Sequence, residues 1–108
     1  MLFRSSSKFQ PFSKADFPKS SCGDSKPTDP SAYPINFYPV NVPYSEDNLA
    51  RVRSSFCADA YQKISKDTRQ PSVQIASFLS EEKAIAFADL IKTEIPEASV
   101  GSPTSYDK

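Results

Sequence analysis

The stretch from Ser72 to Gly101 constrains the fold more than any other part of this 108-residue chain. Its first seven residues, SVQIASF, place apolar side chains between polar ones, as a strand with one buried face does. Ser80 then provides an N-cap for a helix, and Pro96 cannot continue that helix. The helix carries one apolar stripe, formed by Ala84, Phe87, Ala88, Ile91 and Ile95. Ala98 and Val100 alternate with polar residues, so the stretch predicts a strand, a helix and a second strand in close succession.

Residues 35–65 repeat this plan in a weaker form. A strand over 35–42 contains Pro39, which favours an edge strand or an irregular start to the strand, because proline cannot donate to the hydrogen-bond ladder. An amphipathic helix follows, with Ser45 as its N-cap, and a shorter, more polar strand covers 60–65. The apolar stripe of this helix consists of Leu49, Val52 and Phe56. A polar run after the second strand predicts a hairpin connection to the third.

The resulting order of elements is β-α-β-β-α-β. It predicts an α+β fold, a small ferredoxin-like domain in which a four-stranded antiparallel sheet carries both helices on one face. We assign this domain to residues 35–101. Residues 1–34 are expected to form an extended arm, and residues 102–108 a disordered tail. A domain of this size has a single small core.

Composition argues against several classes of function. The 13 basic and 13 acidic residues give no net charge, which disfavours general binding to polyanions such as nucleic acids. The chain has no histidine, so it lacks the commonest general base and zinc ligand. Its paired carboxylates fall in the first turns of the two predicted helices, where the helix dipole explains them. The sequence therefore predicts no enzyme activity, no cofactor and no metal site.

Two cysteines, Cys22 and Cys57, are too few to form a metal cluster alone. Cys22 lies in the predicted arm and Cys57 at the end of the first helix. We expect two free thiols in a reducing cytosol, and a bridge between them is the alternative. The N-terminus shows no secretory signal, and no apolar run is long enough to span a bilayer. The expectation is a cytoplasmic protein, with a position beside a membrane-bound complex left open.

The predicted arm is rich in proline and serine and has no apolar periodicity, so it cannot bury enough surface to fold alone. Its aromatic residues nevertheless recur beside lysine and arginine: they are Phe3, Phe9, Phe12 and Phe17. In one interpretation they are incidental to an unstructured tail. In the other they anchor a docking arm that becomes ordered on a partner protein. Stacking on a nucleic acid is a third and weaker option.

The run VQIASF, followed by SEE and an alanine at the start of the helix, resembles SPOR-like domains. The first half is similar to a version of this domain seen in photosynthetic bacteria, through YPVNVP at 38–43, LARVR at 49–53 and DAY at 59–61. The resemblance covers about residues 37–101. It implies the βαββαβ fold. For the best-known members it also implies binding of peptidoglycan glycan strands on the sheet face opposite the helices. Strand alternation would place the following residues on that face: Asn41, Tyr61, Lys63, Gln74, Ala76 and Ser99.

Two hypotheses of function follow. The favoured one is a non-catalytic docking or linker subunit that binds a larger protein assembly through its aromatic arm and its small domain. The resemblance makes a photosynthetic assembly a conceivable host. The alternative is a SPOR-type module that binds peptidoglycan glycan strands.

Overall fold

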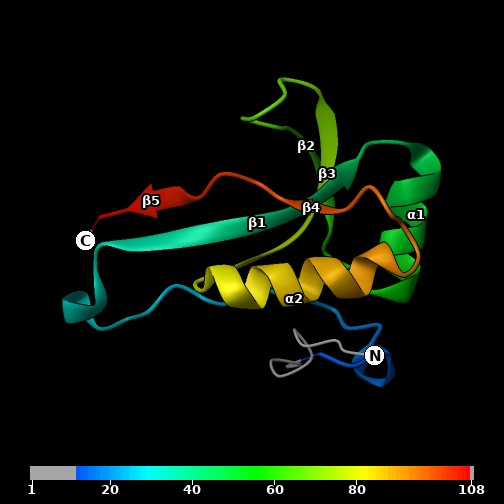
Figure 1. Ribbon diagram of the computed structural model, residues 1–108. Coiled ribbons are helices and arrows are strands. Elements are labelled where there is room, and N and C mark those ends of the chain that lie inside the picture. Colours follow the sequence, from blue (N-terminus) through cyan, green and yellow to red (C-terminus); the bar gives the residue numbers. More distant parts are fainter. Residues whose placement is uncertain (1–11, 108) are drawn as a thin grey trace, which may run out of the picture.

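A computed structural model, which describes residues 12–107, shows an α+β domain and confirms the predicted fold class (Figure 1). The strands are β1 (Ile35–Pro43), β2 (Tyr61–Ile64), β3 (Pro71–Phe78), β4 (Ser99–Val100) and β5 (Thr104–Tyr106). The α-helices are α1 (Glu46–Ser55) and α2 (Glu81–Lys92), and the short 3-10 turns are η2 (Lys14–Asp16) and η3 (Pro30–Ala32). The sheet is antiparallel, in the order β2-β3-β1-β4, and β5 also pairs with β1.

Both predicted helix N-caps are present. The Ser45 hydroxyl accepts a hydrogen bond from the backbone N–H of Asn48, and the Ser80 hydroxyl accepts one from Lys83. Each bond satisfies a backbone donor that has no partner within its helix. α2 ends at Lys92, before the predicted end, although Ile95 is still buried.

The core lies between the helices and one face of the sheet. α2 packs against β1, β3 and β4, and α1 packs against β3. Buried members of the two predicted helical stripes meet the buried strand residues in one cluster: Val40, Val42, Val52, Phe56, Val73, Phe78, Ala84, Phe87, Ala88 and Ile91. The helical and strand periodicities therefore identified the core correctly.

The expectation that Pro39 marks an edge strand is wrong, because β1 lies in the middle of the sheet. The Pro39 carbonyl accepts a hydrogen bond from Gly101, so its nitrogen faces the same side. On that side Pro39 lies opposite residues 101–103, where the partner strand is interrupted between β4 and β5. A central strand thus tolerates this proline.

The placement of Ala76 on the face away from the helices is also wrong. The register between β1 and β3 shifts after Val40, which pairs with Ala76, because Ile75 is an extra residue in β3. This β-bulge reverses the alternation, so both Ile75 and Ala76 are buried in the core. Gln74, which precedes the bulge, keeps its predicted face.

The predicted disorder of residues 102–108 is wrong for β5. Thr104–Tyr106 pairs with Ile35–Phe37, and the Tyr106 ring packs against Phe37 with centroids 5.7 Å apart. Figure 1 shows that β1 and β5 form a two-stranded ribbon, which extends away from the helices.

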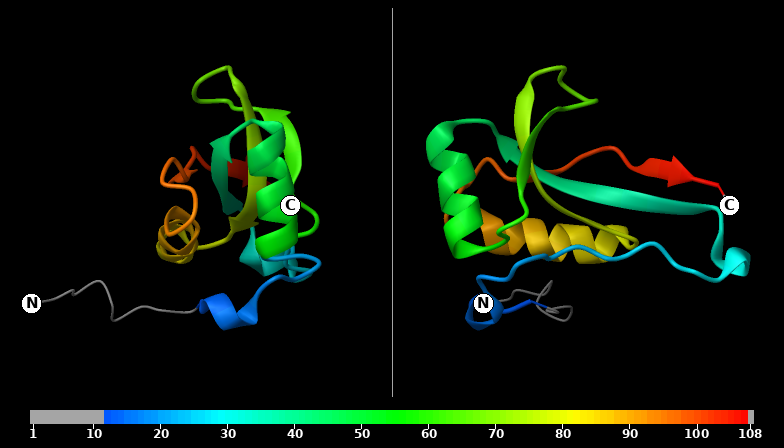
Figure 2. Two further views of the ribbon diagram at one scale, coloured as in Figure 1. Left: turned by 90° about the vertical axis from the view of Figure 1, so that its right-hand side faces the viewer. Right: turned by 180° about the vertical axis from the view of Figure 1, so that it is seen from behind.

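Residues 12–34, the described part of the arm, are packed against the domain and do not project from it. From Lys14 to Asp24 they run beside α2, from its C-terminal to its N-terminal end, and residues 25–34 continue past that end to the start of β1 (Figure 2). Lys14 forms an ion pair with Glu94 at one end, and Asp24 forms one with Lys83 at the other. The predicted free arm is therefore wrong for these residues.

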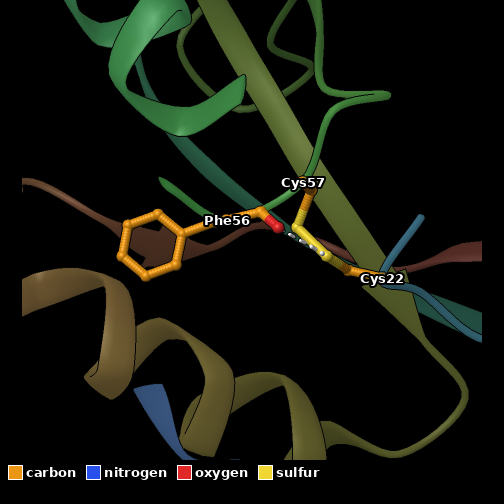
Figure 3. The surroundings of a disulfide bond; sticks show 3 residues. All are labelled: Cys22, Phe56 and Cys57. Carbon is orange, nitrogen blue, oxygen red and sulfur yellow. Dashed lines mark hydrogen bonds between the residues drawn. A yellow bond between two sulfur atoms is a disulfide. The ribbon is translucent and has the colours of Figure 1, made fainter. Parts of the chain in front are cut away.

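The expectation of two free thiols is wrong as well, because Cys22 and Cys57 form a disulfide (Figure 3). Lys19 pairs with the backbone on either side of Cys57, donating to Phe56 and accepting from Ala58, and this brings the two cysteines together. Cys22 Sγ also lies 3.6 Å from the Phe56 carbonyl oxygen. This is a packing contact, since a disulfide sulfur carries no hydrogen.

Candidate binding site on the sheet face

Four of the predicted site residues form one row across the sheet. Asn41 is the register partner of both Ser99 and Gln74, and Gln74 is the partner of Tyr61. Register partners project to the same face, here the one opposite the helices, because their neighbours Val42 and Val73 are buried in the core. Neighbouring strands lie about 4.8 Å apart, so the row spans about 14 Å. We call these four residues the cross-strand row.

A groove of about 510 Å³ lies at the β4 end of this row. Half of its lining residues are neutral and polar: Asn41, Ser65, Thr68, Gln70, Ser72, Ser99 and Ser102. They lie beside apolar surface from Val42, Pro43, Pro71 and Val100. Two carboxylates, Asp67 and Glu97, also line it, and the described lining residues include no lysine or arginine. The groove therefore suits a ligand that is rich in hydrogen-bonding groups and is not densely anionic.

The loop between β2 and β3, residues 65–70, reaches over the sheet face to the segment between β4 and β5. We call this loop the strap. Asp67 accepts hydrogen bonds from the backbone N–H and the hydroxyl of Ser102. The Lys66 ammonium donates to the Pro103 carbonyl at 3.0 Å and to the Thr104 hydroxyl at 3.1 Å. In Figures 1 and 2 the tip of this loop leans over the chain that leads to β5.

The strap changes what is accessible on the predicted face. Lys63 and Gln74 are half-buried beside it, and the Lys63 ammonium donates to the Gln74 side-chain oxygen at 3.0 Å. The space under the strap is only about 10 Å³. Asn41 forms its floor, with a buried Oδ1 that has no hydrogen-bond partner among the described residues. The face is therefore open only at its ends, where Ser99 and Tyr61 are exposed.

A second hollow, of about 280 Å³, lies at the Tyr61 end of the row, and we call it the arm-edge pocket. The arm supplies one wall, and β2, β3 and Asp59 in the segment that leads into β2 supply the rest: Ser21, Gly23, Asp24, Ser25, Asp59, Tyr61, Gln74, Ile75, Ala76 and Ser77. The arm is held there by the Asp24 N–H, which donates to Ser77, and by the Asp24 carboxylate, which accepts from Leu79. The disulfided arm is thus part of the site.

The electrostatics of the strap favour an ionised Asp67. The hydroxyl and then the N–H of Ser102 hold the pKa of this carboxyl below its usual value, with a smaller contribution from the Lys66 charge. Both bonds stabilise the charged form. Around neutral pH, Asp67 is therefore ionised and accepts both hydrogen bonds from Ser102.

The predicted arm residues divide into two groups. Phe12 and Phe17 pack against Phe87 in the core, at centroid distances of 5.1 and 5.8 Å. They are therefore not free to anchor the chain to a partner. Phe3 and Phe9 lie outside the described residues.

Sequence reasoning missed the strap residues Lys66 and Asp67 and their partners Ser102 and Thr104. The hairpin was recognised as a polar turn, but no local pattern links it to a segment 35 residues later. One signal was available, because the chain has only two glycines and both lie where backbone crosses the sheet closely. A Cβ on Gly23 would lie 2.6 Å from the Ser77 oxygen, and one on Gly101 would lie 3.1 Å from Asp67.

Comparisons with models of protein families, with curated proteins and with solved structures found no match for this chain. Within residues 12–107, no helix has the length and apolar character that crossing a bilayer requires. The same residues contain no group of three or more side chains arranged to hold a metal ion. The functional argument thus depends on the site itself.

Proposed function

We propose that the protein is a non-catalytic binding module that holds a linear glycan strand, of the kind found in peptidoglycan, against the cross-strand row. One observation carries this proposal. Neutral hydrogen-bonding side chains lie in line across four strands and open at one end into a groove of about 510 Å³. This volume is within the range of about 300–1,000 Å³ that is typical of small-molecule sites.

The chemistry of the lining matches that of a sugar chain. Sugar hydroxyls both donate and accept hydrogen bonds, as do the serine and threonine hydroxyls and the amides of the groove. Tyr61 is 47% exposed at the other end of the row, where its ring offers a flat apolar surface to a sugar ring. The two carboxylates disfavour a densely anionic polymer such as a nucleic acid.

The disulfide supports a location for this activity. Disulfides persist in oxidising compartments and are rare in the reducing cytosol. The Cys22–Cys57 bridge therefore favours a site of action outside the cytoplasm, where glycan strands are found, in place of the cytoplasmic location expected from the sequence.

The docking-subunit hypothesis has less support. It depended on four aromatic anchors, and two of them, Phe12 and Phe17, pack against the protein's own core. That Phe3 and Phe9 anchor the chain to a partner protein stays a prediction. The absence of histidine from the chain supports the non-catalytic part of either proposal.

Co-sedimentation with purified cell-wall sacculi tests the glycan proposal. We expect the wild type to sediment and Tyr61→Ala to bind about fivefold to tenfold more weakly, because stacking on the ring is lost. Gln62→Ala is the matched control, since Gln62 is exposed on the same strand but pairs with the buried Val73 and so projects to the other face. A wild type that stays in the supernatant would overturn the proposal. Equal losses in both variants would exclude Tyr61 as a contact.

A further inference from the structure

The hollows on the sheet face form a line and share residues. Asn41 and Ser72 line both the groove and the space under the strap. Gln74 lines both that space and the arm-edge pocket. Between two hollows of about 510 and 280 Å³, the space under the strap holds about 10 Å³, which is room for about one water molecule. The strap therefore separates the groove from the arm-edge pocket. Without the strap, the two hollows would be continuous along the sheet face.

We propose that the groove and the arm-edge pocket are the two ends of one polysaccharide cleft, and that the strap opens to admit a glycan strand and closes over it. This inference rests on the proposed function and extends it. It assigns the ligand a minimum length, gives the strap a role in entry and release, and makes the arm a wall of the site.

The strap is attached in a way that allows it to open. Its ties to residues 102–104 are four hydrogen bonds made by exposed residues, for which water competes. No strap residue belongs to the apolar core. Arg69 has a φ of 62°, a left-handed conformation that costs free energy for a residue with a Cβ. The strap is thus a polar loop with weak attachments and local strain.

The floor under the strap has unused hydrogen-bonding capacity. Asn41 Oδ1 is buried without a partner among the described residues, which is rare for a polar atom in a folded protein. Gln74 uses its oxygen to accept from Lys63. An open strap would let sugar hydroxyls donate to Asn41 Oδ1 and accept from the side-chain NH2 group of Gln74. In the closed state, the strap therefore covers hydrogen-bonding groups of Asn41 and Gln74. A glycan strand that lies across the row would form hydrogen bonds with them.

The length of the ligand follows from this geometry. A disaccharide can occupy the groove without passing under the strap. A longer oligosaccharide must cross the row, which spans about 14 Å, to reach Tyr61. Affinity should therefore increase with chain length, and only the longer ligands should depend on the strap.

The experiment uses the full chain and neutral chito-oligosaccharides, from chitobiose to chitohexaose, as probes. Association and dissociation rate constants are measured for the wild type and for Lys66→Ala/Asp67→Ala, which removes all four ties. Lys66→Ala alone is a second variant, because Lys66 does not line the groove. Arg69→Ala is the control, since Arg69 belongs to the strap but does not line the groove and is not among the residues that tie the strap to 102–104.

We expect both rate constants for chitohexaose to rise about fivefold or more in the double variant, because the open state becomes more populated. The rate constants for chitobiose in Lys66→Ala, and those for both probes in Arg69→Ala, should change little, because neither residue lines the groove. Unchanged chitohexaose kinetics in both strap variants would overturn the role of the strap. Equal wild-type affinities for chitobiose and chitohexaose would overturn the joined cleft. If the wild type binds neither these probes nor sacculi, the proposed function itself fails, which is a distinct result.

Discussion

The arm and the strap both cover parts of the same domain, but they are attached by different physical means. The arm is held by a disulfide, by backbone pairing around Cys57 and by two aromatic rings that pack against the core. The strap is held by hydrogen bonds at the surface. Covalent and apolar attachments persist in water, whereas exposed hydrogen bonds contribute little net free energy. The comparison indicates that the arm is a permanent part of the fold and the strap is a movable part of the site.

The largest expected effect comes from breaking the covalent attachment of the arm. Cys22→Ser/Cys57→Ser removes a cross-link between residues 35 apart and should lower the free energy of unfolding by about 3–4 kcal/mol. Urea unfolding measures this loss. The strap variant Lys66→Ala/Asp67→Ala should leave the urea midpoint almost unchanged. If the urea midpoint fell more in the strap variant than in the cysteine variant, the strap would be the more strongly attached segment, contrary to this account.

The aromatic attachment of the arm comes next. Phe17 is half-buried against Phe56 and Phe87, so Phe17→Ala should cost about 2–3 kcal/mol, less than a fully buried phenylalanine. Tyr61→Ala is the matched control, because this exposed aromatic residue packs little. Thermal unfolding by circular dichroism gives both values. If Phe17→Ala and Tyr61→Ala lowered the free energy of unfolding by the same small amount, the Phe17 ring would not stabilise the domain.

The same comparison explains how much of the molecule the sequence predicted. Local periodicity and capping identified both helices, the first four strands and the core, because each of these is encoded within a few residues of itself. Alternation also placed Asn41 and Gln74 on one face, but it misplaced Ala76, since a bulge has no signal in a single sequence. The disulfide, β5 and the strap depend on pairing between distant segments that have no periodicity. A polar turn such as 66–70 looks the same whether it is free or tied to another segment.

The two glycines provide a smaller, paired test. A Cβ on Gly23 would meet the backbone oxygen of Ser77 at 2.6 Å, so Gly23→Ala should cost about 1–3 kcal/mol, although the disulfide still tethers the arm. The closest atoms to a Cβ on Gly101 belong to the side chains of Asn41, Asp67 and Pro39, at 3.0 to 3.2 Å. Side chains at the surface can move, so Gly101→Ala should cost less. Chemical denaturation gives the free energy of unfolding of each variant. A larger loss in Gly101→Ala than in Gly23→Ala would contradict the account.

The smallest effect is the response of the strap to acid. Because Ser102 lowers the pKa of Asp67 in the folded protein, the strap contributes stability above the unfolded pKa and loses it as the pH falls through the lower folded pKa. The strap should therefore stay closed at neutral pH and loosen only under acid conditions. Carbon-detected NMR titration of the Asp67 carboxyl measures this. In Ser102→Ala the pKa should move back up towards the usual value for aspartate, and an unchanged pKa would exclude Ser102 as the cause.

Amide hydrogen exchange, measured with and without chitohexaose, tests the central claim most directly. The Ser102 N–H bonds to Asp67 in the strap, and the Asp24 and Ala58 N–H groups bond to Ser77 and Lys19 in the arm contacts. We predict that Ser102 exchanges through local opening in the free protein and slows when chitohexaose is bound. Asp24 and Ala58 should exchange slowly in both states. A Ser102 amide as protected as Asp24 in the free protein, or one that chitohexaose leaves unchanged, would contradict the account.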